Sequence, residues 1–251
     1  MKKERINMLQ ELIESEQEIS MEKLIHQFEL SESTLRRYLD ILEKQGLIEK
    51  HYGGVRAVIN TIPYDKRFDR NIQSKHRIGV LAASLIKDND SIFIDSGTTT
   101  IHIIDSLKNV KNITIITNNM NVVYLCKKFK NFKIIFLGGE FINSTNCCAN
   151  YDTVKILKKY NLDKAFIAAN GFSLQKGATN SDICEHDIKS LAVKQSQQSI
   201  LVVDHSKFGR AGLATFASVN AFHTIITDQM PDQSYIDYCS SNQIELLWPS
   251  V

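Results

Sequence analysis

The chain has 251 residues, of which 43% are hydrophobic and 23% are charged, and its formal net charge at pH 7 is +2. This length allows one small and one larger globular domain, and no apolar stretch is long enough to cross a membrane. The five cysteines are odd in number and lack paired-ligand spacing, and the charged start leads into an amphipathic segment, so we expect a reduced, cytoplasmic protein.

Residues 31–46 predict a helix that fits the major groove of DNA. Ser31 is a favourable N-cap, Gly46 suits the helix end, and leucines at 35, 39 and 42 recur at helical spacing. Hydroxyl and guanidinium groups near the helix start stay off this apolar face, as base contacts require. The residues expected at the DNA are Ser31, Ser33, Thr34, Arg36, Arg37 and the adjacent Tyr38. Taken alone, two adjacent arginines are more typical of an ordinary solvent-exposed helix than of a DNA recognition helix. The choice between the two therefore depends on the flanking segments.

Those flanking segments favour a winged helix-turn-helix over residues 1–58. Residues 19–28 predict a short helix capped by Ser20, and residues 29–30 form the turn. Residues 47–58 predict two strands joined at a Gly-Gly turn, a wing that would follow DNA phosphates through Lys50, His51, Tyr52 and Arg56. Residues 1–60 carry nine Lys+Arg against eleven Asp+Glu (9 − 11 = −2). We therefore expect binding to depend on local placement and on a homo-oligomer that engages several half-sites.

A second, larger domain is predicted after a polar linker at residues 59–75. From residue 76 to 251, segments rich in Ile, Val and Phe alternate with amphipathic helices. This predicts an α/β domain with a mainly parallel, Rossmann-like sheet covered on both faces. The expected strands are 91–95, 113–117, 133–137, 164–168, 200–204, 224–227 and 244–247, and the expected helices are 76–86, 98–107, 119–129, 152–160, 185–196 and 234–241.

Glycine or small polar residues follow five consecutive strands, at the carboxyl ends where an open α/β sheet binds its ligand. The first of these segments would place backbone N–H groups at a helix start, where an anion is favoured, and a lysine after the fifth would add a point charge. Ordinary loops explain each segment singly, whereas one pocket for a polyhydroxylated phosphate explains them together. The candidate residues are Asp95, Ser96, Gly97, Thr98, Thr99, Thr100, Thr117, Asn118, Gly138, Gly139, Gly171, Asp204 and Lys207.

The segment Cys184-Glu185-His186-Asp187 has the composition of a metal site. Adjacent helical residues point in different directions, however, and ligands on one helix need a spacing of three or four residues. A helix start with Glu185 and Lys189 as an i,i+4 pair is the better interpretation, so we expect no metal and no other cofactor.

Two sets of motifs resemble the DeoR family of bacterial sugar-metabolism repressors. The first, in residues 5–57, includes Ser31-x-x-Thr34-Leu-Arg36-Arg37 and His51-Tyr-Gly53-Gly54, with Tyr38 where the family usually has aspartate. The second, in residues 75–228, includes Asp95-Ser-Gly-Thr-Thr99, Leu137-Gly-Gly139 and Asp204-His-Ser-Lys207-Phe-Gly209. The resemblance implies a sensor domain folded like ribose-5-phosphate isomerase that binds a phosphorylated sugar, with the phosphate at residues 97–99 and Lys207 beside the sugar.

Further motifs, including Lys176-Gly-Ala-Thr179 and Glu185 with Lys189, are similar to those of the family's repressors of deoxyribose operons. This implies a repressor released from double-stranded operator DNA by deoxyribose 5-phosphate, with Glu185 among the effector-binding residues. Asn118-Asn119-x-Asn121-Val122 is similar to glycerol-3-phosphate repressors, so another sugar phosphate is the alternative effector. An isomerase-like enzyme with a fused DNA-binding domain is a second alternative, with an aspartate at a strand end as its base. The fused domain argues against it, since a sensor benefits from releasing its ligand unchanged.

Overall fold

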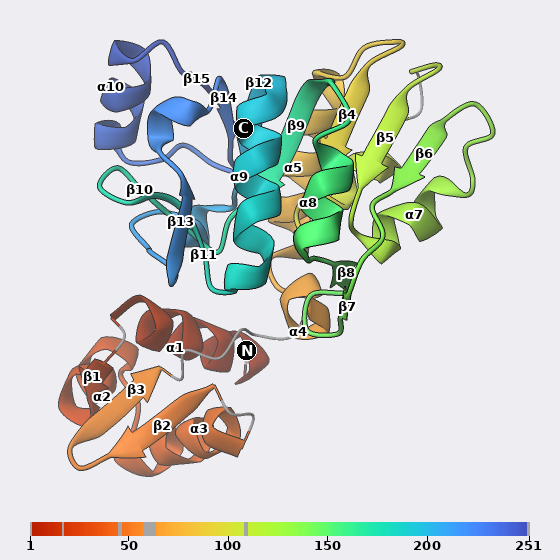
Figure 1. Ribbon diagram of the computed structural model, residues 1–251. Helices are drawn as coiled ribbons and strands as arrows, with labels where there is room; N and C mark the ends of the chain where they lie inside the picture. Colours follow the sequence, from red (N-terminus) through yellow and green to blue (C-terminus); the bar gives the residue numbers. More distant parts are fainter. Residues whose placement is uncertain (1, 17, 45–46, 58–63, 108–109, 250–251) are drawn as a thin grey trace. The chain divides into compact units, whose positions relative to one another are not determined.

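The computed structural model describes residues 2–16, 18–44, 47–57, 64–107 and 110–249. The chain divides into two compact units, Met1–Ile62 and Pro63–Val251, and the colours of Figure 1 follow it from red in the first to blue in the second. No helix in these described ranges is long and apolar enough to cross a membrane.

The first unit is a winged helix-turn-helix. Its helices are α1 (Lys2–Glu16), α2 (Met21–Phe28) and α3 (Glu32–Lys44), and its strands are β1 (Glu18–Ser20), β2 (Ile48–His51) and β3 (Gly54–Ala57). The strands form an antiparallel sheet in the order β1-β3-β2. Leu9 of α1, Leu24 of α2 and Leu39 of α3 are fully buried against Val55 of the wing. The predicted helix pair and wing are thus confirmed.

The start of α2 differs from the prediction. Ile19, expected in the helix, pairs with Val55 in a third strand, because its side chain is buried while those of Glu18 and Ser20 on either side are exposed. The helix begins after Ser20, whose hydroxyl accepts a hydrogen bond from the backbone N–H of Lys23 at 3.2 Å. Gly46, expected at the end of the recognition helix, lies outside the described residues.

The second unit is built on a seven-stranded sheet in which every neighbouring pair is parallel. The strand order is β15-β14-β12-β9-β4-β5-β6. The predicted parallel sheet is confirmed, and each predicted strand is present with its ends shifted by a few residues. The strands are β4 (Ser91–Ile94), β5 (Thr114–Thr117), β6 (Lys133–Phe136), β9 (Leu162–Ala168), β12 (Ser196–Val202), β14 (Thr224–Ile226) and β15 (Glu245–Leu247).

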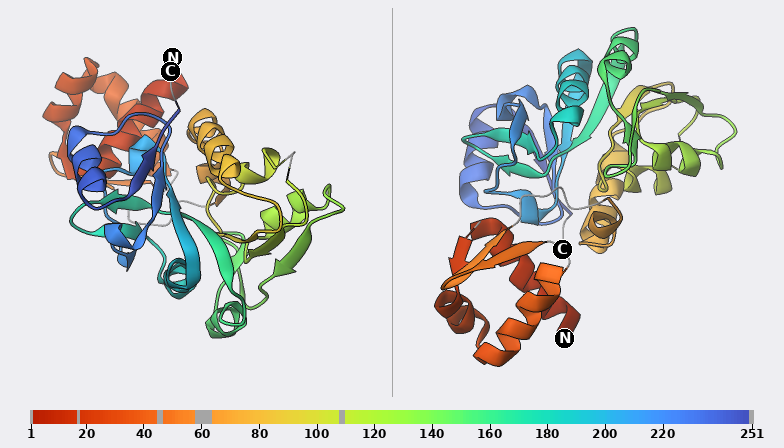
Figure 2. Two further views of the ribbon diagram at one scale, coloured as in Figure 1. Left: turned by 90° about the horizontal axis from the view of Figure 1, so that it is seen from above. Right: turned by 60° about the horizontal axis from the view of Figure 1, so that its bottom comes forward.

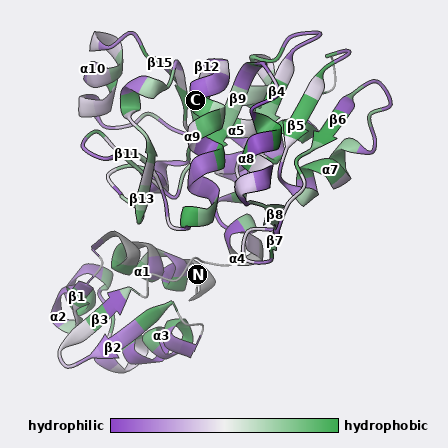
Figure 3. Cartoon of the chain, viewed as in Figure 1, coloured by the Kyte–Doolittle hydropathy of each residue, from purple (hydrophilic) through white to green (hydrophobic). Residues whose placement is uncertain are grey.

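Helices cover both faces of this sheet. On one face lie α5 (Ile72–Ser84), α6 (His102–Asp105) and α7 (Met120–Cys126), and on the other lie α8 (Tyr151–Leu157), α9 (His186–Gln195) and α10 (Gln233–Ser241). The left view of Figure 2, seen from above, shows α5 (gold) and α9 (cyan) on opposite sides of the sheet. Alternate strand residues enter the two cores, with Phe166 in the first and Ile167 in the second. Much of β5 and β9 is accordingly hydrophobic in Figure 3.

Two small antiparallel sheets lie outside the predicted pattern. One contains β10 (Gly171–Ser173), β11 (Gly177–Asn180) and β13 (Ala214–Ala217), and the other pairs β7 (Phe141–Ile142) with β8 (Cys147–Cys148). These strands have two to four residues, and β10 and β11 are buried along their whole length, so they show no alternation of polar and apolar residues.

The predicted linker at residues 59–75 is partly helical. A short helix, α4 (Tyr64–Phe68), lies within it, and α5 begins at Ile72 rather than at residue 76. Ser74 and Lys75 are buried although both are polar, and Tyr64 is buried as well. The polar composition of this segment therefore reflects contacts made inside the second unit. Residues 58–63 lie outside the described ranges.

Candidate functional site

The order of the strands reverses at the carboxyl edge of the parallel sheet. β4 lies between β5 and β9, so the chain leaves β4 towards one side and later returns on the other. Such a reversal opens the crevice in which α/β proteins bind their ligands. Asp95 follows β4 at this edge, Asn118 follows β5, Asn170 follows β9 and Asp204 follows β12. The structure therefore brings the predicted strand-end segments to one edge.

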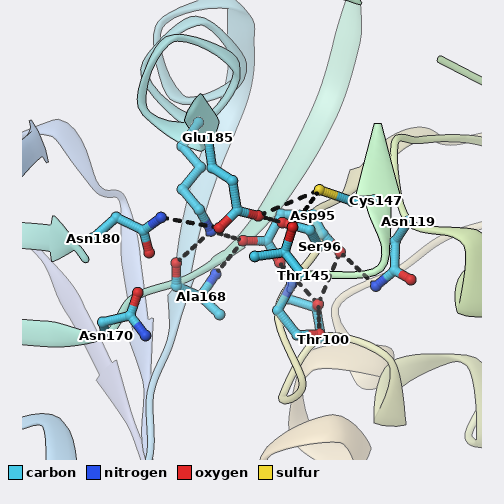
Figure 4. Close-up of polar contacts among 12 residues, drawn as sticks. Asp95, Ser96, Thr100, Asn119, Thr145, Cys147, Ala168, Asn170, Asn180 and Glu185 are labelled. Carbon is cyan, nitrogen blue, oxygen red and sulfur yellow. Dashed lines mark hydrogen bonds and ion pairs between the residues drawn. The ribbon is translucent and has the colours of Figure 1, made fainter. Parts of the chain in front are cut away.

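Asp95 is the centre of the polar network at this reversal (Figure 4). Its carboxylate accepts hydrogen bonds from the backbone N–H of Gly97 at 2.8 Å, the hydroxyl of Thr100 at 2.8 Å and the backbone N–H of Ala168 at 3.0 Å. It also forms a buried ion pair with Lys189, whose ammonium donates to the Ala168 carbonyl at 3.0 Å. One carboxylate thus binds the end of β4, its following loop, the end of β9 and α9.

Glu185 is a second buried carboxyl group beside the same lysine. It accepts hydrogen bonds from the Asn180 amide at 3.0 Å, the Cys147 thiol at 3.7 Å and the hydroxyl of Ser96. Figure 4 shows these side chains converging from separate segments. Burial alone lowers the pKa of Lys189, but the carboxylates of Asp95 and Glu185 raise it above its usual value. The lysine is therefore charged, and two carboxyl groups face one ammonium.

The loop after β4 differs from the predicted phosphate loop. The helix expected over residues 98–107 is the four-residue α6, so a helix dipole contributes little to anion binding. A Cβ at Gly97 would lie 2.4 Å from the Cβ of Ala168, so this glycine allows β4 and β9 to pack closely. The hydroxyls of Ser96 and Thr100 are bonded within the network. The backbone N–H groups of Thr98 and Thr99 donate to no described residue.

Three other predicted residues have structural contacts of their own. The hydroxyl of Thr117 donates to the carbonyl of Ile94 at 2.6 Å and joins the ends of β5 and β4. A Cβ at Gly139 would lie 2.2 Å from the Thr153 hydroxyl, and one at Gly171 would lie 2.7 Å from a backbone carbonyl oxygen. Both glycines are therefore required by close packing. Gly138, in contrast, has open space where a Cβ would stand.

Basic residues surround the end of β12. Asp204 is buried there and accepts hydrogen bonds from the Asn71 amide at 3.2 Å and the backbone N–H of Ser206 at 3.0 Å. Burial works against its ionisation, but the charge of Lys207, a hydrogen bond from the Ser206 hydroxyl, the charge of Lys75 and the Asn71 amide lower the pKa of Asp204 below its usual value. Lys207 is partly exposed.

Lys75, which the sequence pattern places in the linker, is a buried cation beside this group. It is 3% exposed at the start of α5, and its ammonium donates to the carbonyl oxygens of Arg67 and Phe68. Burial lowers the pKa of Lys75 to about 7, against the opposing attraction of Asp204 and with a further contribution from Lys207. The partners bonded to this ammonium are neutral carbonyl groups, so an anion bound nearby would favour its charged form.

Three buried side-chain atoms in the described part of the chain have no hydrogen-bond partner, and all three belong to segments around this edge. They are the Tyr64 hydroxyl, His102 Nε2 and Asn118 Oδ1. The other amide atom of Asn118, Nδ2, donates to the Cys148 carbonyl at 3.0 Å. Buried polar atoms are normally satisfied by protein, water or ligand. The free oxygen of Asn118 is therefore suited to accept a hydrogen bond from a ligand hydroxyl.

The segment Cys184–Asp187 is divided between different surroundings. Glu185 points into the buried network, whereas the ring nitrogens of His186 contact the Asp187 carboxylate at 2.9 Å and the Thr215 carbonyl at 3.0 Å. Among the residues that the structure describes, no three His, Cys, Asp or Glu side chains gather as a metal site.

In the first unit, α3 presents most of the predicted DNA-facing residues to solvent. Ser31 caps the helix, with its hydroxyl accepting the backbone N–H of Thr34 at 3.3 Å, and Ser33 and Arg37 are exposed. Tyr38 is only 6% exposed and packs in the core with Leu35 and Leu42. The prediction that Tyr38 lies at the DNA surface is wrong, because its spacing of three and four residues from those leucines places it on the same helix face.

Most predicted basic contacts pair with acidic neighbours at the surface. The pairs are Arg36 with Glu32 (2.7 Å), Lys50 with Glu43 (2.7 Å) and Asp40, His51 with Glu18 (3.3 Å) and Arg56 with Glu49 (3.0 Å). Exposed pairs of this kind contribute little stability and are readily exchanged for phosphate. Arg37 has no acidic partner in the described ranges and lies over the Tyr38 ring at 5.7 Å. Tyr52 is fully exposed at the turn of the wing.

Comparisons with known proteins match both units. A family model described as "DeoR C terminal sensor domain" matches residues 70–229, and one described as "DeoR-like helix-turn-helix domain" matches residues 5–61. The chain is 38% identical over 246 residues to the HTH-type transcriptional regulator IolR of Bacillus subtilis, covering 97% of this chain and 98% of that protein.

Two further relatives bear on the predicted effectors. The glycerol-3-phosphate regulon repressor of Escherichia coli is 30% identical over 97% of both chains, and the deoxyribose operon repressor of Escherichia coli is 28% identical over 98% of both. The identities therefore do not favour the deoxyribose repressor over other relatives. Among solved structures, ribose 5-phosphate isomerase A from Methanocaldococcus jannaschii is similar over 55% of both chains, with a TM-score of 0.40 and 18% identity.

The buried Asp95–Lys189 pair leads to a stability prediction. The substitution Asp95→Asn removes the carboxylate that is ion-paired with the buried Lys189 ammonium and leaves only Glu185 nearby, so we expect the second unit to lose about 3–5 kcal/mol of unfolding free energy. Asp105→Asn is the matched control, because Asp105 pairs with Lys128 at the surface and the loss should stay below about 1 kcal/mol. Denaturant unfolding measures both. A loss at Asp95 no larger than at Asp105 would show that the pair does not hold this edge together.

Proposed function

This chain belongs to the DeoR family of helix-turn-helix regulators, and on that premise we propose that it is a transcriptional repressor of a sugar-metabolism operon, released from its operator by a phosphorylated sugar. The observation that carries the proposal is the presence, in one chain, of an exposed recognition helix and a strand-end site with a buried, incompletely paired lysine. The three relatives described above are named as regulators or repressors. We therefore treat the chain as a regulator and not as an isomerase.

The DNA-binding half of the proposal rests on α3 and the wing. Ser33 and Arg37 are exposed near the start of α3, where a recognition helix contacts base edges. The wing carries Tyr52 at its turn, with Lys50 and Arg56 in its two strands. We propose that the helix reads bases while the wing follows phosphates, with their surface ion pairs exchanged for contacts to DNA. The contacts proposed are Ser31, Ser33, Thr34, Arg36, Arg37, Lys50, His51, Tyr52 and Arg56.

For the effector, we propose that its phosphate binds at the free N–H groups of Thr98 and Thr99. Lys75 supports this position, because its ammonium donates to the carbonyl of Phe68, whose ring stacks on His102 just after the loop. Burial first, and then the charge of Lys75, lower the pKa of His102, and Lys75 also interacts electrostatically with Asp204 and Lys207 at the end of β12. A phosphate there would gain two backbone donors and two lysine charges.

The sugar end of the effector would face a different environment. Asp95 and Glu185 place two carboxyl groups beside the single ammonium of Lys189, which disfavours a second anionic group at that position. Asn118 offers a buried acceptor, which suits a hydroxyl. We propose deoxyribose 5-phosphate as the effector because of the motifs shared with deoxyribose repressors, with glycerol 3-phosphate as the alternative. Both are neutral polyols apart from one phosphate.

Release from DNA requires that the effector bind two arrangements of the protein with different affinity. We propose a homo-oligomer whose recognition helices engage repeated half-sites in one arrangement. Effector binding favours the other arrangement, in which the helices are wrongly spaced. A coupling of this kind works in both directions, so operator DNA must weaken effector binding by the same factor.

A thermal-shift titration tests the effector assignment. The panel is deoxyribose 5-phosphate, ribose 5-phosphate, glycerol 3-phosphate, fructose 1-phosphate, tagatose 6-phosphate and free deoxyribose. We expect deoxyribose 5-phosphate to stabilise the protein, by about 2.7 kcal/mol at a hundred times its Kd, and free deoxyribose to have no effect. Lys207→Ala should shift the titration to higher concentrations. Stabilisation by a different phosphate would replace the effector and keep the site, and no stabilisation by any compound would refute the site.

The pKa of Lys75 predicts that effector affinity falls as pH rises. Burial lowers this pKa to about 7 in the free protein, and a bound phosphate raises it, so binding above pH 7 takes up a proton. Kd should rise between about pH 7.5 and 9, by at most about tenfold per pH unit, while a phosphate with a second pKa of about 6 keeps its charge. Lys75→Met should bind weakly at every pH, and exposed Lys130→Met should behave like wild type. Isothermal titration measures Kd at each pH. A wild-type Kd that does not change with pH would contradict the placement of Lys75 at the phosphate.

Arg37 should be required for DNA binding and not for effector binding. Its guanidinium is exposed and has no acidic partner in the described ranges, so Arg37→Ala should cost about 1–3 kcal/mol of operator affinity, or roughly a 5- to 150-fold weaker Kd. Lys44→Ala, exposed in the last turn of the same helix, is the control. Gel-shift assays with a duplex selected from a random pool by the wild-type protein measure this loss. An equal loss of operator affinity in Arg37→Ala and Lys44→Ala would show that Arg37 does not contact the bases.

A further inference from the structure

The short helix α4 is attached to the strand-end site on several sides. Tyr64, its first residue, is 4% exposed, and its backbone N–H donates to the carbonyl of Ser144, in the connection between β7 and β8, at 3.0 Å. The ring of Phe68 stacks on that of His102 in α6, with centroids 5.7 Å apart. At its carboxyl end, α4 offers the carbonyl oxygens of Arg67 and Phe68 to the ammonium of Lys75. α4 therefore contacts three elements that form the site.

The hydroxyl of Tyr64 is the part of α4 whose burial is unexplained. It is one of the three buried atoms without a hydrogen-bond partner in the described chain. Burial raises the pKa of Tyr64, and the side-chain amides of Asn121 and Asn119, which approach the hydroxyl closely enough to hydrogen-bond weakly with it, lower it, as does the charge of Arg67, whereas the carboxylate of Asp95 raises it. Neither amide has the distance and angle of a full hydrogen bond to the hydroxyl. The two amides and Asp95 follow β5 and β4, so the hydroxyl lies beside the strand-end site and keeps its proton at neutral pH.

Packing accounts for the ring of Tyr64 but not for its hydroxyl. The ring lies near Phe68, at a centroid distance of 6.2 Å, and under the guanidinium of Arg67 at 5.8 Å. Phenylalanine would make both contacts without burying an oxygen that lacks a partner. Burying a hydroxyl without a hydrogen bond is unfavourable, so its retention points to a partner that is present only when the site is filled.

We propose that the Tyr64 hydroxyl donates a hydrogen bond to the bound sugar phosphate, and that α4 thereby couples occupancy of the site to the segment that joins the two units. Tyr64 is the first described residue after residues 58–63, which connect the DNA-binding unit to the second unit. Lys75 contributes to the same coupling, because the ammonium that would meet the phosphate also holds the last carbonyl groups of α4. The inference rests on the proposed function, since it takes the sugar phosphate as the ligand.

Tyr64→Phe tests the hydrogen bond, because it removes one oxygen and keeps the ring. The probe is the panel compound that stabilises the wild-type protein most. We expect Tyr64→Phe to weaken its binding by about three- to tenfold in isothermal titration, with operator affinity in the absence of effector unchanged. Tyr124→Phe removes a hydroxyl from an exposed ring and should bind like wild type. Equal effector affinity in Tyr64→Phe, Tyr124→Phe and wild type would overturn the proposed contact.

Tyr64→Ala tests the coupling separately from the contact. For each variant, the concentration of effector that releases half of the operator is divided by its Kd. We expect this ratio to rise at least threefold in Tyr64→Ala, because the effector still meets the lysines and the loop while α4 has lost its anchor. A ratio equal to that of wild type would overturn the coupling and leave the contact. If Tyr64→Ala does not fold, the same ratio in Phe68→Leu, which weakens the stacking on His102, takes its place.

The proposed function and the inference about Tyr64 can be disproved separately. If no panel compound binds the wild-type protein, the proposed function fails and the inference fails with it. If a sugar phosphate binds the wild-type protein and releases DNA, and Tyr64→Phe behaves identically, only the inference is wrong.

Discussion

The buried ion pair between Asp95 and Lys189 is the constraint on which the carboxyl edge of the sheet, and with it the proposed effector site, depends. Removing two charges from water is unfavourable, and attraction compensates only when the remaining hydrogen bonds are satisfied. Here the carboxylate accepts two backbone N–H groups and a hydroxyl, and the ammonium donates to a backbone carbonyl. These partners come from β4, its loop and β9, the strands on either side of the reversal. The pair therefore ties β4, its following loop, β9 and α9 together.

This arrangement divides the predicted effector residues into a scaffold and a binding surface. Asp95, Ser96, Gly97, Thr100 and Thr117 bond or pack against other parts of the protein, and Gly139 and Gly171 accommodate neighbouring atoms. What remains for a ligand is the backbone of Thr98 and Thr99, the acceptor of Asn118 and the lysines near β12. At the reversal two carboxyl groups share the ammonium of Lys189, whereas at β12 the carboxylate of Asp204 is accompanied by Lys207 and Lys75. A ligand with one anionic end and one hydroxyl-bearing end would be oriented by this gradient.

The sequence predicts the fold well because its signals are local. Parallel strands read as Ile- and Val-rich runs, and the helices of both units show apolar periodicity. Predictions fail where three-dimensional contacts override composition. The sequence pattern predicts Tyr38 at the surface, but its spacing from Leu35 and Leu42 places it in the core. The same pattern predicts Lys75 in a polar linker, but it lies three residues before Ile78 on the buried face of α5. The hydroxyl-rich loop is predicted correctly as a strand end, but which hydroxyls are already bonded depends on β9 and α9, which lie far away in sequence.

A sensor requires a site that is unsatisfied without its ligand, and the structure has this property at one edge of the sheet. In the described part of the chain, Lys75 is buried without a carboxylate bonded to it, and Tyr64, His102 and Asn118 bury polar atoms that lack partners. Each of these groups makes the free site less stable than a fully bonded one, and each belongs to a segment that contacts its neighbours directly. A ligand that satisfies them gains free energy only in the arrangement that presents them together. Under the proposed function, such a difference in affinity between arrangements is what release of DNA requires.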